Sequence, residues 1–402
     1  MNLPNTPKIV ISPKAMKSIE RRHPWIFSGA VRHADTTVEP GETVAVHAPD
    51  GRWLAWGAYS PHSQIRVRLW SFDPHDTISA DFFHRRLNLA FGLRDRLALV
   101  SPCTARRLVN AESDGLPGLI VDQYDDFLVC QFLAAGVERQ RDSIVAALRR
   151  LGSFHGLYER SDTDARKKEG LPLRSGLLWG TPPPDTISVR LGGMDMLVDV
   201  VRGHKTGYYL DQRENQACIQ RYANGKTVLN CFSYTGAFGL WALAGGASHV
   251  TNIDASESTL ALAEQNRARN RLPAERWDQV AANVFEQLRA YRDSGRQFDL
   301  IVLDPPKFVA SAGQLDKGCR GYKDINLLAF KCLAPGGVLF TFSCSGLVAP
   351  NLFQKIVFDA AMDAGRQIQL IDHLHQAADH PIALTFPQAH YLKGLVCIDA
   401  DE

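Results

Sequence analysis

The sequence predicts an α/β protein whose last part forms a parallel sheet covered by helices, with two smaller β-containing parts before it. From about Val189 onward, short apolar runs alternate with helical patterns, as in repeated βαβ units. The first part instead holds short alternating runs separated by turn residues, which is typical of a small β-rich unit. At 402 residues the chain is long enough for more than one core. We therefore expect three domains, 1–73, 74–188 and 189–402.

In the first domain, basic and aromatic residues lie close together. The runs ETVAVHA, WLAWGAY and QIRVRLW are the expected strands, and Arg21 and Arg22 stand just before Trp25. Basic side chains beside aromatic rings suit a phosphate backbone with bases that can stack. The same composition also fits an aromatic core under a solvated charged face. Because the net charge is only +2, any nucleic-acid site must be local.

The middle domain mixes helical and strand patterns. The run ADFFHRRLNLAFGLRDRL has apolar residues at helical spacing, and ERQRDSIVAALRRL is an amphipathic helix. The run GLPGLIVDQYDDFLVCQFL indicates two strands with a turn. GTPPPDT excludes a regular helix, because consecutive prolines remove backbone donors. We expect an α+β domain that ends in a linker or hairpin there.

The chain has the composition of a cytoplasmic protein. Eight cysteines are scattered without a C-x-x-C pair, which favours reduced thiols over a disulfide framework or a zinc ribbon. The start, MNLPNTPKIV, lacks the pattern of a signal peptide. Nowhere do about 18 apolar residues run together, as a membrane span requires. We expect no membrane partner.

The first strand-to-helix turn of the last domain is small and contains glycine. Residues Asn230 to Gly239 read NCFSYTGAFG, and small residues there let the backbone approach a ligand at the helix N-terminus. The dinucleotide pattern G-x-G-x-x-G is absent, which argues against a pyrophosphate cofactor and a nicotinamide dehydrogenase. Asp254, at the end of the next strand, suits the hydroxyls of a ribose. Together these features indicate S-adenosylmethionine, which has a ribose and no phosphate.

Two further strand ends carry polar side chains. The third strand ends near Asn283, whose amide suits the edge of adenine, and the fourth ends at Asp304 within DPPKF. Each feature is weak alone, since a D-P-P turn is also a common rigid strand exit. Four strand ends aligned in the expected order favour one common site at this edge of the sheet.

A single thiol follows the fifth strand, within TFSCSG. Carbon 5 of cytosine does not attack a sulfonium unaided, but thiolate addition to carbon 6 makes the ring an enamine that can. This chemistry needs a cysteine and an acid facing one flipped base, and Cys344 and Asp304 lie at neighbouring strand ends. The alternative is a small buried hydrophobe, the common fate of a free cysteine. Cys231 is a rival thiol, but it would face the cofactor rather than the base.

Several segments carry a resemblance to a known family. They are NCFSYTGAFG, LDPPKF, TFSCSG, GHKTGYYLDQRENQ, LVNAESDGLPGLIVDQY, DHPIALTFPQAHYLKGL and PKAMKSIERRHPWIFSGAV. Together they resemble the bacterial 23S ribosomal RNA 5-methylcytosine methyltransferases with an N-terminal PUA domain, over nearly the whole chain. The resemblance implies a Rossmann-like class I methyltransferase domain that uses S-adenosylmethionine, behind an RNA-binding PUA domain and an α+β middle domain. It implies 23S rRNA or the large ribosomal subunit as partner, and it suggests a homodimer.

The resemblance also implies roles for single positions. The nucleophile falls on Cys344 and the acid on Asp304. The implied cofactor contacts are Gln212, which would close the site, and Asn230, Phe232, Tyr234, Thr235, Gly236, Asp254, Asn283 and Asp304. Relatives often carry Asp where this chain has Asn283, but an amide oxygen still accepts a hydrogen bond.

Five residues are candidates for contact with the RNA. Lys205 and Tyr208 precede the first strand of the last domain and would either line the base pocket or pack the sheet edge. Lys307 stands in DPPKF, and Arg21 and Arg22 belong to the PUA-like segment.

Other functions remain as alternatives. DPPKF resembles the motif of exocyclic-amine methyltransferases, although a lysine occupies the position of their stacking aromatic residue. A non-catalytic RNA-binding factor of ribosome assembly would keep the fold without turnover. Near the C-terminus, His373, His375, Asp379, His380 and His390 crowd together, but no hydrolase helix motif accompanies them, so we expect no metal.

Overall fold

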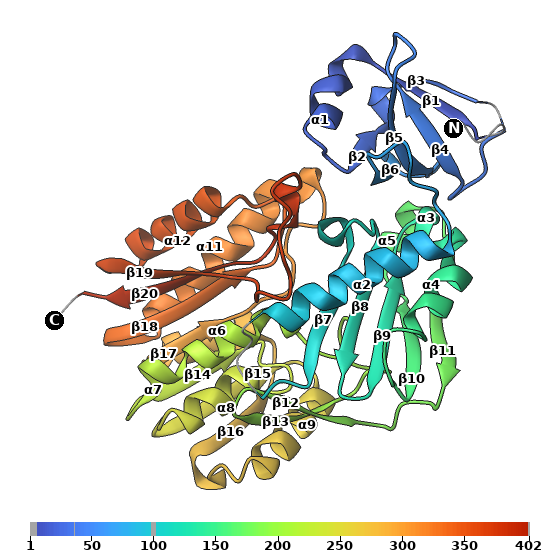
Figure 1. Ribbon diagram of the computed structural model, residues 1–402. Coiled ribbons are helices and arrows are strands. Elements are labelled where there is room, and N and C mark those ends of the chain that lie inside the picture. The colour runs from blue at the N-terminus through green and yellow to red at the C-terminus, as the bar shows by residue number, and fades with distance from the viewer. Residues whose placement is uncertain (1–5, 36, 98–101, 401–402) are drawn as a thin grey trace. The chain divides into compact units, whose positions relative to one another are not determined.

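The computed structural model describes residues 6–35, 37–97 and 102–400 (Figure 1). The outer ends of the first and last expected domains, 1–5 and 401–402, lie outside these residues. The chain forms two compact units. Unit 1 comprises the described residues of Met1–Val189, Val198–Leu210 and Ala378–Ala389, and unit 2 comprises those of Arg190–Leu197, Asp211–Ala377 and His390–Glu402.

Unit 1 begins with a six-stranded sheet in the order β2-β6-β5-β4-β1-β3. Its elements are β1 (Lys8–Ile11), α1 (Met16–Glu20), β2 (Trp25–Phe27), β3 (Val31–Ala34), β4 (Thr43–His47), β5 (Trp53–Tyr59) and β6 (Ile65–Ser71). Neighbouring strands are antiparallel except β1 and β4, which are parallel. Ile9, Val44 and Val67 are fully buried in one core cluster on this sheet. The alternating runs of the sequence thus form the expected strands.

A five-stranded sheet in the order β11-β10-β9-β8-β7 follows in unit 1. Its strands are β7 (Ala105–Asn110), β8 (Leu119–Tyr124), β9 (Phe127–Phe132), β10 (Gly156–Ser161) and β11 (Arg174–Gly180), and its helices are α2 (Ala80–Arg96), α3 (Ala135–Arg139), α4 (Arg141–Leu148) and α5 (Asp164–Lys168). Only β9 and β10 pair in parallel. The long helix and the two-strand turn expected from the sequence correspond to α2 and to β8 with β9.

The two sheets of unit 1 share one hydrophobic core. Trp56 of β5 and Trp70 of β6 belong to the same buried cluster as Phe82 and Phe83 of α2. The rings of Trp70 and Phe83 meet edge to face, with their centroids 5.3 Å apart. The expected limit between residues 73 and 74 therefore falls in a loop between two sheets that pack together. The limits of the three expected domains stay a prediction.

Unit 2 contains a seven-stranded sheet in the order β16-β15-β14-β17-β18-β20-β19. Its strands are β14 (Thr227–Cys231), β15 (His249–Asp254), β16 (Trp277–Ala281), β17 (Phe298–Leu303), β18 (Leu333–Ser343), β19 (Ile368–His375) and β20 (Lys393–Asp399). A separate two-stranded sheet joins β12 (Ile187–Leu191) to β13 (Met194–Val198). The five strands from β16 to β18 are parallel, as expected, whereas β20 is antiparallel to both β18 and β19.

Helices cover both faces of the unit 2 sheet. They are α6 (Arg213–Cys218), α7 (Gln220–Ala223), α8 (Ala237–Ala244), α9 (Glu257–Arg269), α10 (Val284–Asp293), α11 (Leu315–Lys331) and α12 (Pro350–Ala364). Along β18, Leu339 joins the core cluster of α10, α11 and α12, and Figure 1 shows α11 and α12 lying together beside this strand. The next residue, Phe340, contacts Tyr222 of α7, and Phe342 contacts Phe238 of α8. A strand buried on both faces in this way is a near-continuous apolar run.

The parallel strands bring their carboxyl ends to one edge of the sheet. The register pairs Cys231 with Ile253 and with Leu303, and Leu303 in turn with Thr341. In open α/β sheets ligands bind at this edge. The four strand ends singled out in the sequence therefore share one edge. No helix of the described ranges is both long and apolar enough to cross a membrane.

Candidate active site at the edge of the unit 2 sheet

The loop between β14 and α8 is held in an unusual backbone conformation. Phe232, Tyr234 and Gly236 lie in the left-handed region, with φ of 56°, 49° and 81°. For a residue other than glycine this costs about 1–3 kcal/mol, and such residues cluster at functional sites. The end of β15 fixes the loop, because Tyr234 donates its N–H to Asp254 Oδ2 at 2.9 Å and Ser233 donates to the carbonyl of Ile253.

Buried polar atoms of this loop are left without partners. Asn230 Oδ1, Ser233 Oγ and Thr235 Oγ1 make no hydrogen bond within the described residues. Most buried polar atoms in folded proteins are hydrogen-bonded, so three such atoms together need an explanation. A polar ligand seated on the loop would satisfy them. The loop therefore fits S-adenosylmethionine, whose ribose and amino-acid groups supply donors and acceptors.

Asp254 and Asn283 close the next two strands. Asp254 is half-buried, and its Oδ1 accepts a hydrogen bond from the N–H of Ser256 at 3.0 Å. Asn283 is exposed and caps α10, since its Oδ1 accepts from the N–H of Phe285 at 2.9 Å. The cap uses the amide oxygen, so the amide N–H₂ group of Asn283 is the part that would face a bound adenine.

Asp304, which follows β17, is the end of a relay, a chain of side-chain hydrogen bonds through Gln212 and Asn215. Gln212, which is 1% exposed, donates from Nε2 to Asp304 Oδ1 at 2.9 Å. Asn215 of α6 donates from Nδ2 to Gln212 Oε1 at 2.6 Å and to the carbonyl of His375 at 3.0 Å. Gln212 and Asp304, which the resemblance assigned to one site, are therefore in direct contact.

Cys344 follows β18 and is partly exposed. Since Leu303 and Thr341 are register partners, Asp304 and Cys344 are separated by one strand spacing, about 5 Å, and by about two residues, roughly 7 Å, along the strand. Ser345, the residue after Cys344, is buried, and its Oγ lies 2.9 Å from the hydroxyl of Tyr322 on α11. The thiol thus stands on a hydrogen-bonded turn at the strand end next to that of Asp304.

A buried lysine lies beside this turn. Lys393 begins β20 and pairs with Ser343, and it is only 4% exposed. Burial lowers the pKa of Lys393 from 10.5 to about 8, while neighbouring Cys344 acts to raise it and Lys307 to lower it. Lys393 was not singled out in the sequence. Its only signal there is a lysine that starts an otherwise apolar run, KGLVCI.

The rival thiol Cys231 is enclosed in the core. It is 0% exposed and belongs to the cluster that β14 shares with α10 and α11. Burial raises the pKa of Cys231 well above its ordinary value. A thiol that stays protonated and inaccessible does not act as a nucleophile.

Lys205 and Tyr208 lie in a segment of unit 1. Lys205 has a left-handed backbone, φ 54°, and its Nζ stands 4.4 Å from the ring centroid of Tyr209. Tyr208 is 2% exposed, and its N–H bonds to the hydroxyl of Tyr124 on β8 at 3.1 Å. This burial of Tyr208 agrees with the packing alternative. Lys307, in unit 2, is exposed.

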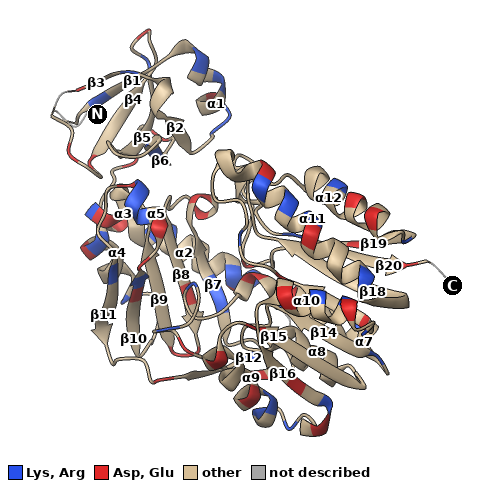
Figure 2. Cartoon of the chain, turned by 180° about the vertical axis from the view of Figure 1, so that it is seen from behind, with Lys and Arg blue, Asp and Glu red and all other residues tan. Residues whose placement is uncertain are grey.

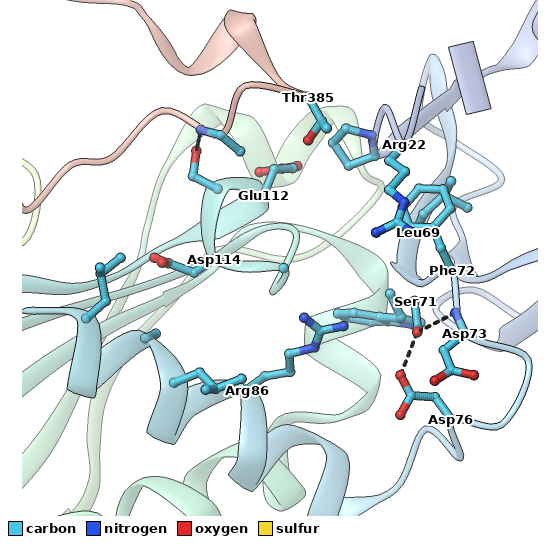
Figure 3. Close-up of a pocket in the computed structure, with 18 of the residues that line it drawn as sticks. Arg22, Leu69, Ser71, Phe72, Asp73, Asp76, Arg86, Glu112, Asp114 and Thr385 are labelled. Carbon is cyan, nitrogen blue, oxygen red and sulfur yellow. Dashed lines mark hydrogen bonds between the residues drawn. The ribbon is translucent and has the colours of Figure 1, made fainter. Parts of the chain in front are cut away.

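Arg21 and Arg22 directly follow α1 and are exposed. Figure 2 shows basic residues on α1, whereas α11 and α12 carry both signs of charge. Arg22 lines a cavity of about 860 Å³, and Figure 3 shows its side chain reaching toward that of Arg86 from α2. Arg96 of the same helix also lines it. Arg86 and Arg96 were not singled out in the sequence, because α2 carries basic residues all along its length.

Within the described residues, three of the four acids that line this cavity are paired with arginines outside its lining, whereas Asp73 forms no ion pair. Glu112 pairs with Arg68, Asp114 with Arg94 and Asp76 with Arg85, at 3.5, 2.6 and 2.9 Å. Within the described ranges, neither Arg22, Arg86 nor Arg96 forms an ion pair. Burial, as the largest cause, lowers the pKa of Arg86. Among the residues that the structure describes, the cavity therefore holds three guanidinium groups outside ion pairs against one carboxylate outside an ion pair, an excess of positive charge that suits an anion.

The histidines near the C-terminus are divided between the two units. Asp379 and His380 belong to unit 1, where His380 Nδ1 lies 2.9 Å from Asp379 Oδ1 and both residues are buried. His373, His375 and His390 belong to unit 2. Among the residues that the structure describes, no group of three His, Cys, Asp or Glu side chains is arranged to hold a metal ion.

Comparison with known proteins defines the class. The family described as S-adenosylmethionine-dependent methyltransferase matches residues 174–393, and the family described as PUA-like domain matches residues 9–72. A structure described as a SAM-dependent methyltransferase from Streptococcus mutans shares the fold, with a TM-score of 0.85 and 24% identity over 97% of this chain and 99% of that one. Another, a methyltransferase solved with SAH, gives 0.86 and 23% over the same shares. The fold and the site define an S-adenosylmethionine-dependent class I methyltransferase.

Curated relatives narrow the family. Ribosomal RNA large subunit methyltransferase I of Aeromonas salmonicida is 53% identical over 94% of this chain and 96% of its own length. The protein of the same name from Escherichia coli is 50% identical over 97% of this chain and 98% of its own length. The chain belongs to the ribosomal RNA large subunit methyltransferase I family. The fold class, the family and the cofactor expected from the sequence are thereby confirmed.

Proposed function

We propose that the protein transfers a methyl group from S-adenosylmethionine to carbon 5 of a cytosine in 23S rRNA, with Cys344 as covalent nucleophile. The relatives' name, ribosomal RNA large subunit methyltransferase I, supports the substrate. The observation that carries the chemistry is the partly exposed thiol beside Asp304 at the ligand edge of the sheet. Cys231, the rival thiol, is enclosed in the core instead.

The cofactor would be held by the loop after β14 and by the following strand ends. Ser233, Thr235 and Asn230 have the unsatisfied polar atoms, while Asp254 and Asn283 would meet the ribose and the adenine. When bound, S-adenosylmethionine supplies an electrophilic methyl group. Phe232, Tyr234 and Gly236 shape the loop that approaches it.

Asp304 and Cys344 would act on the base. Asp304, oriented by Gln212, would hydrogen-bond the cytosine ring near nitrogen 3, which stabilises the charge that forms there. The Cys344 thiolate would add to carbon 6, and carbon 5 would then attack the methyl group. The target base must leave the RNA stack for both groups to reach it.

Unit 1 would hold part of the RNA chain. Arg22 and Arg86 in the 860 Å³ cavity are suited to phosphate oxygens, because neither forms an ion pair within the described ranges. Arg21, Lys205 and Lys307 are further candidates for phosphate contacts. Since large ribosomal subunits are cytoplasmic in bacteria, we expect the protein there. The homodimer suggested by the resemblance stays a prediction, which light scattering tests.

The proposal is tested with labelled S-adenosylmethionine and unmodified 23S rRNA, followed by digestion and mass spectrometry of the nucleosides. We expect labelled 5-methylcytidine, and we expect Cys344→Ala to abolish it while cofactor binding remains. Cys319→Ala, which removes a partly exposed thiol on α11, is the matched control. A labelled exocyclic amine, or full activity of Cys344→Ala, would overturn the thiol mechanism.

A further inference from the structure

Lys393 is a buried cation without a carboxylate partner in the described part of the chain. Its Nζ donates to the carbonyl of Ser345 and to the carbonyl of Tyr391, both at 2.7 Å. Lysines are almost never fully buried unless they are paired, because a desolvated charge is costly. Two neutral carbonyls solvate the ammonium group but do not balance its charge. The environment of Lys393 therefore favours a nearby anion.

The titratable groups around Lys393 point to one anion. Cys344 raises the pKa of Lys393, as an anion-forming neighbour does, and Lys307 opposes it with a like charge. The pKa of His390 is lowered, first by burial and then by Lys393 and His375. Tyr322 on α11 is kept protonated, since burial raises its pKa and Cys344 adds to the shift. Of these neighbours, Cys344 and Tyr322 become anions when they lose a proton, and since Tyr322 is kept protonated, the Cys344 thiol is the group left to balance Lys393.

The strand arrangement fixes the pair. Lys393 is the register partner of Ser343, and its ammonium group bonds to the carbonyl of Ser345, so it holds the backbone on both sides of Cys344. The antiparallel strand β20 thus brings a buried cation to the turn that carries Cys344. Thiols beside lysine or arginine are ionised at lower pH than isolated thiols.

We propose that Lys393 is a positioning residue that pairs with the Cys344 thiolate and keeps it ready to attack the base. This rests on the proposed function, in which that thiolate is the nucleophile. When the bond from sulfur to carbon 6 forms, the thiolate charge passes into the ring, and Lys393 loses its counter-ion. When carbon 5 has received the methyl group and lost its proton to water, the bond to sulfur breaks and its electron pair restores the thiolate. The pairing therefore favours release of the methylated base.

The test is the pH profile of Cys344 alkylation by iodoacetamide, followed by peptide mass spectrometry. Cys319 in the same sample is the internal reference, because it is also partly buried but has no lysine partner among the described residues. In the wild-type protein we expect the Cys344 profile to have its midpoint below that of free N-acetylcysteine. In Lys393→Met we expect alkylation of Cys344 at pH 7 to fall about tenfold, as Cys319 stays unchanged. In Lys393→Arg, which keeps the charge, much of the rate should return.

Calorimetry measures the binding of S-adenosylmethionine to each variant, and a variant that binds it is folded. Equal Cys344 profiles in the wild type and in a cofactor-binding Lys393→Met would overturn the pairing. If the variants fail to bind cofactor, the pH profile of wild-type Cys344 alone tests the pairing. A midpoint at or above that of N-acetylcysteine would then overturn the proposed pairing. Alkylation needs no turnover, so it tests the ion pair independently of the proposed function. If the profiles show the pairing but Cys344→Ala is fully active, Cys344 is not the nucleophile, whereas the ion pair is still supported.

Discussion

Gln212 donates a hydrogen bond from its side-chain nitrogen to Asp304 Oδ1 at 2.9 Å, and its side-chain oxygen is held by Asn215 at 2.6 Å. This arrangement defines which way the Gln212 amide points. Since the oxygen accepts from Asn215, only the nitrogen can face Asp304. The two residues lie far apart in the sequence, one before the first strand of the parallel sheet and the other after β17. The relay therefore sets the orientation of the acid expected to meet the base.

Gln212→Leu should impair methyl transfer more than cofactor binding. Without its donor, Asp304 turns away from the productive geometry, and such a misplacement costs about 10²-fold in rate. Asn215→Leu should act in the same direction but more weakly. Single-turnover rates of both variants and of the double variant check this. Because the residues act in one relay, the double variant should be no slower than Gln212→Leu, and additive losses would contradict the relay.

Ser233→Ala and Thr235→Val should have opposite effects on cofactor affinity and on stability. If the unsatisfied hydroxyls meet S-adenosylmethionine, each loss weakens binding by about 1 kcal/mol, or about fivefold. Without cofactor, removing a buried hydroxyl that has no partner should leave the unfolding free energy unchanged or raise it. Calorimetry and urea unfolding measure the two quantities.

Thr163→Val is the matched control for this pair. Thr163 Oγ1 is also buried without a partner among the described residues, but it lies in unit 1. We expect the same neutral or positive change in stability and no change in cofactor affinity. Weaker cofactor binding in Thr163→Val would show that the effect is not local to the loop.

Lys393→Met should raise the free energy of unfolding, and the size of this increase should depend on pH. Burial lowers the folded-state pKa of Lys393 to about 8, below its ordinary value of 10.5, so the unfolded chain binds this proton more tightly. The resulting destabilisation is complete below pH 8 and disappears as the pH rises to 10.5. The unfolding free energy of Lys393→Met relative to wild type should therefore fall by about 3 kcal/mol across that window. A difference that is constant from pH 7 to pH 10.5 would contradict the lowered pKa.

Arg86→Gln should weaken binding of single-stranded RNA and reduce its dependence on salt. For single strands, the slope of log K against log salt concentration becomes shallower by about 0.7 for every phosphate that is no longer bound. Arg85→Gln is the matched control, because Arg85 is the preceding residue of α2 and is already paired with Asp76. Fluorescence anisotropy at several salt concentrations measures both variants. Equal slopes for the two would remove the cavity as an RNA contact.

Competition with inorganic phosphate and free nucleotides tests whether the same cavity binds a small phosphate compound instead of RNA. If they compete with RNA at micromolar concentration, the cavity binds a small phosphate compound rather than the RNA chain. We expect competition only at millimolar concentration, since a single phosphate meets few of the guanidinium groups.

The parallel part of the sheet could be predicted from the sequence because each of its strands is an apolar run followed by a helical pattern. The strand ends at Asp254, Asn283, Asp304 and Cys344 follow from that order, since parallel strands share one carboxyl edge. The contact of Asn283 with the cofactor stays a prediction. The structure adds that the side-chain oxygen of Asn283 caps α10.

Lys393 and the arginine cavity could not be found in the same way. Lys393 reaches Cys344 only through the pairing of β20 with β18, and the sequence does not show that β20 runs antiparallel. The cavity joins Arg22 to Arg86 through the packing of two sheets, which depends on the shared tryptophan and phenylalanine core. Periodicity predicts which face of an element is buried but not which element covers it.

The position of β20 has a consequence for synthesis on the ribosome. Of the described strands in the unit 2 sheet, β20 is made last, yet it lies between β18 and β19. Until residues 393–399 emerge from the exit tunnel, β18 has an open edge and β19 has no neighbour. Open edges of apolar strands are templates for wrong pairing between chains. Aggregation during expression should therefore be sensitive to mutations in this segment, even where the finished protein would tolerate them.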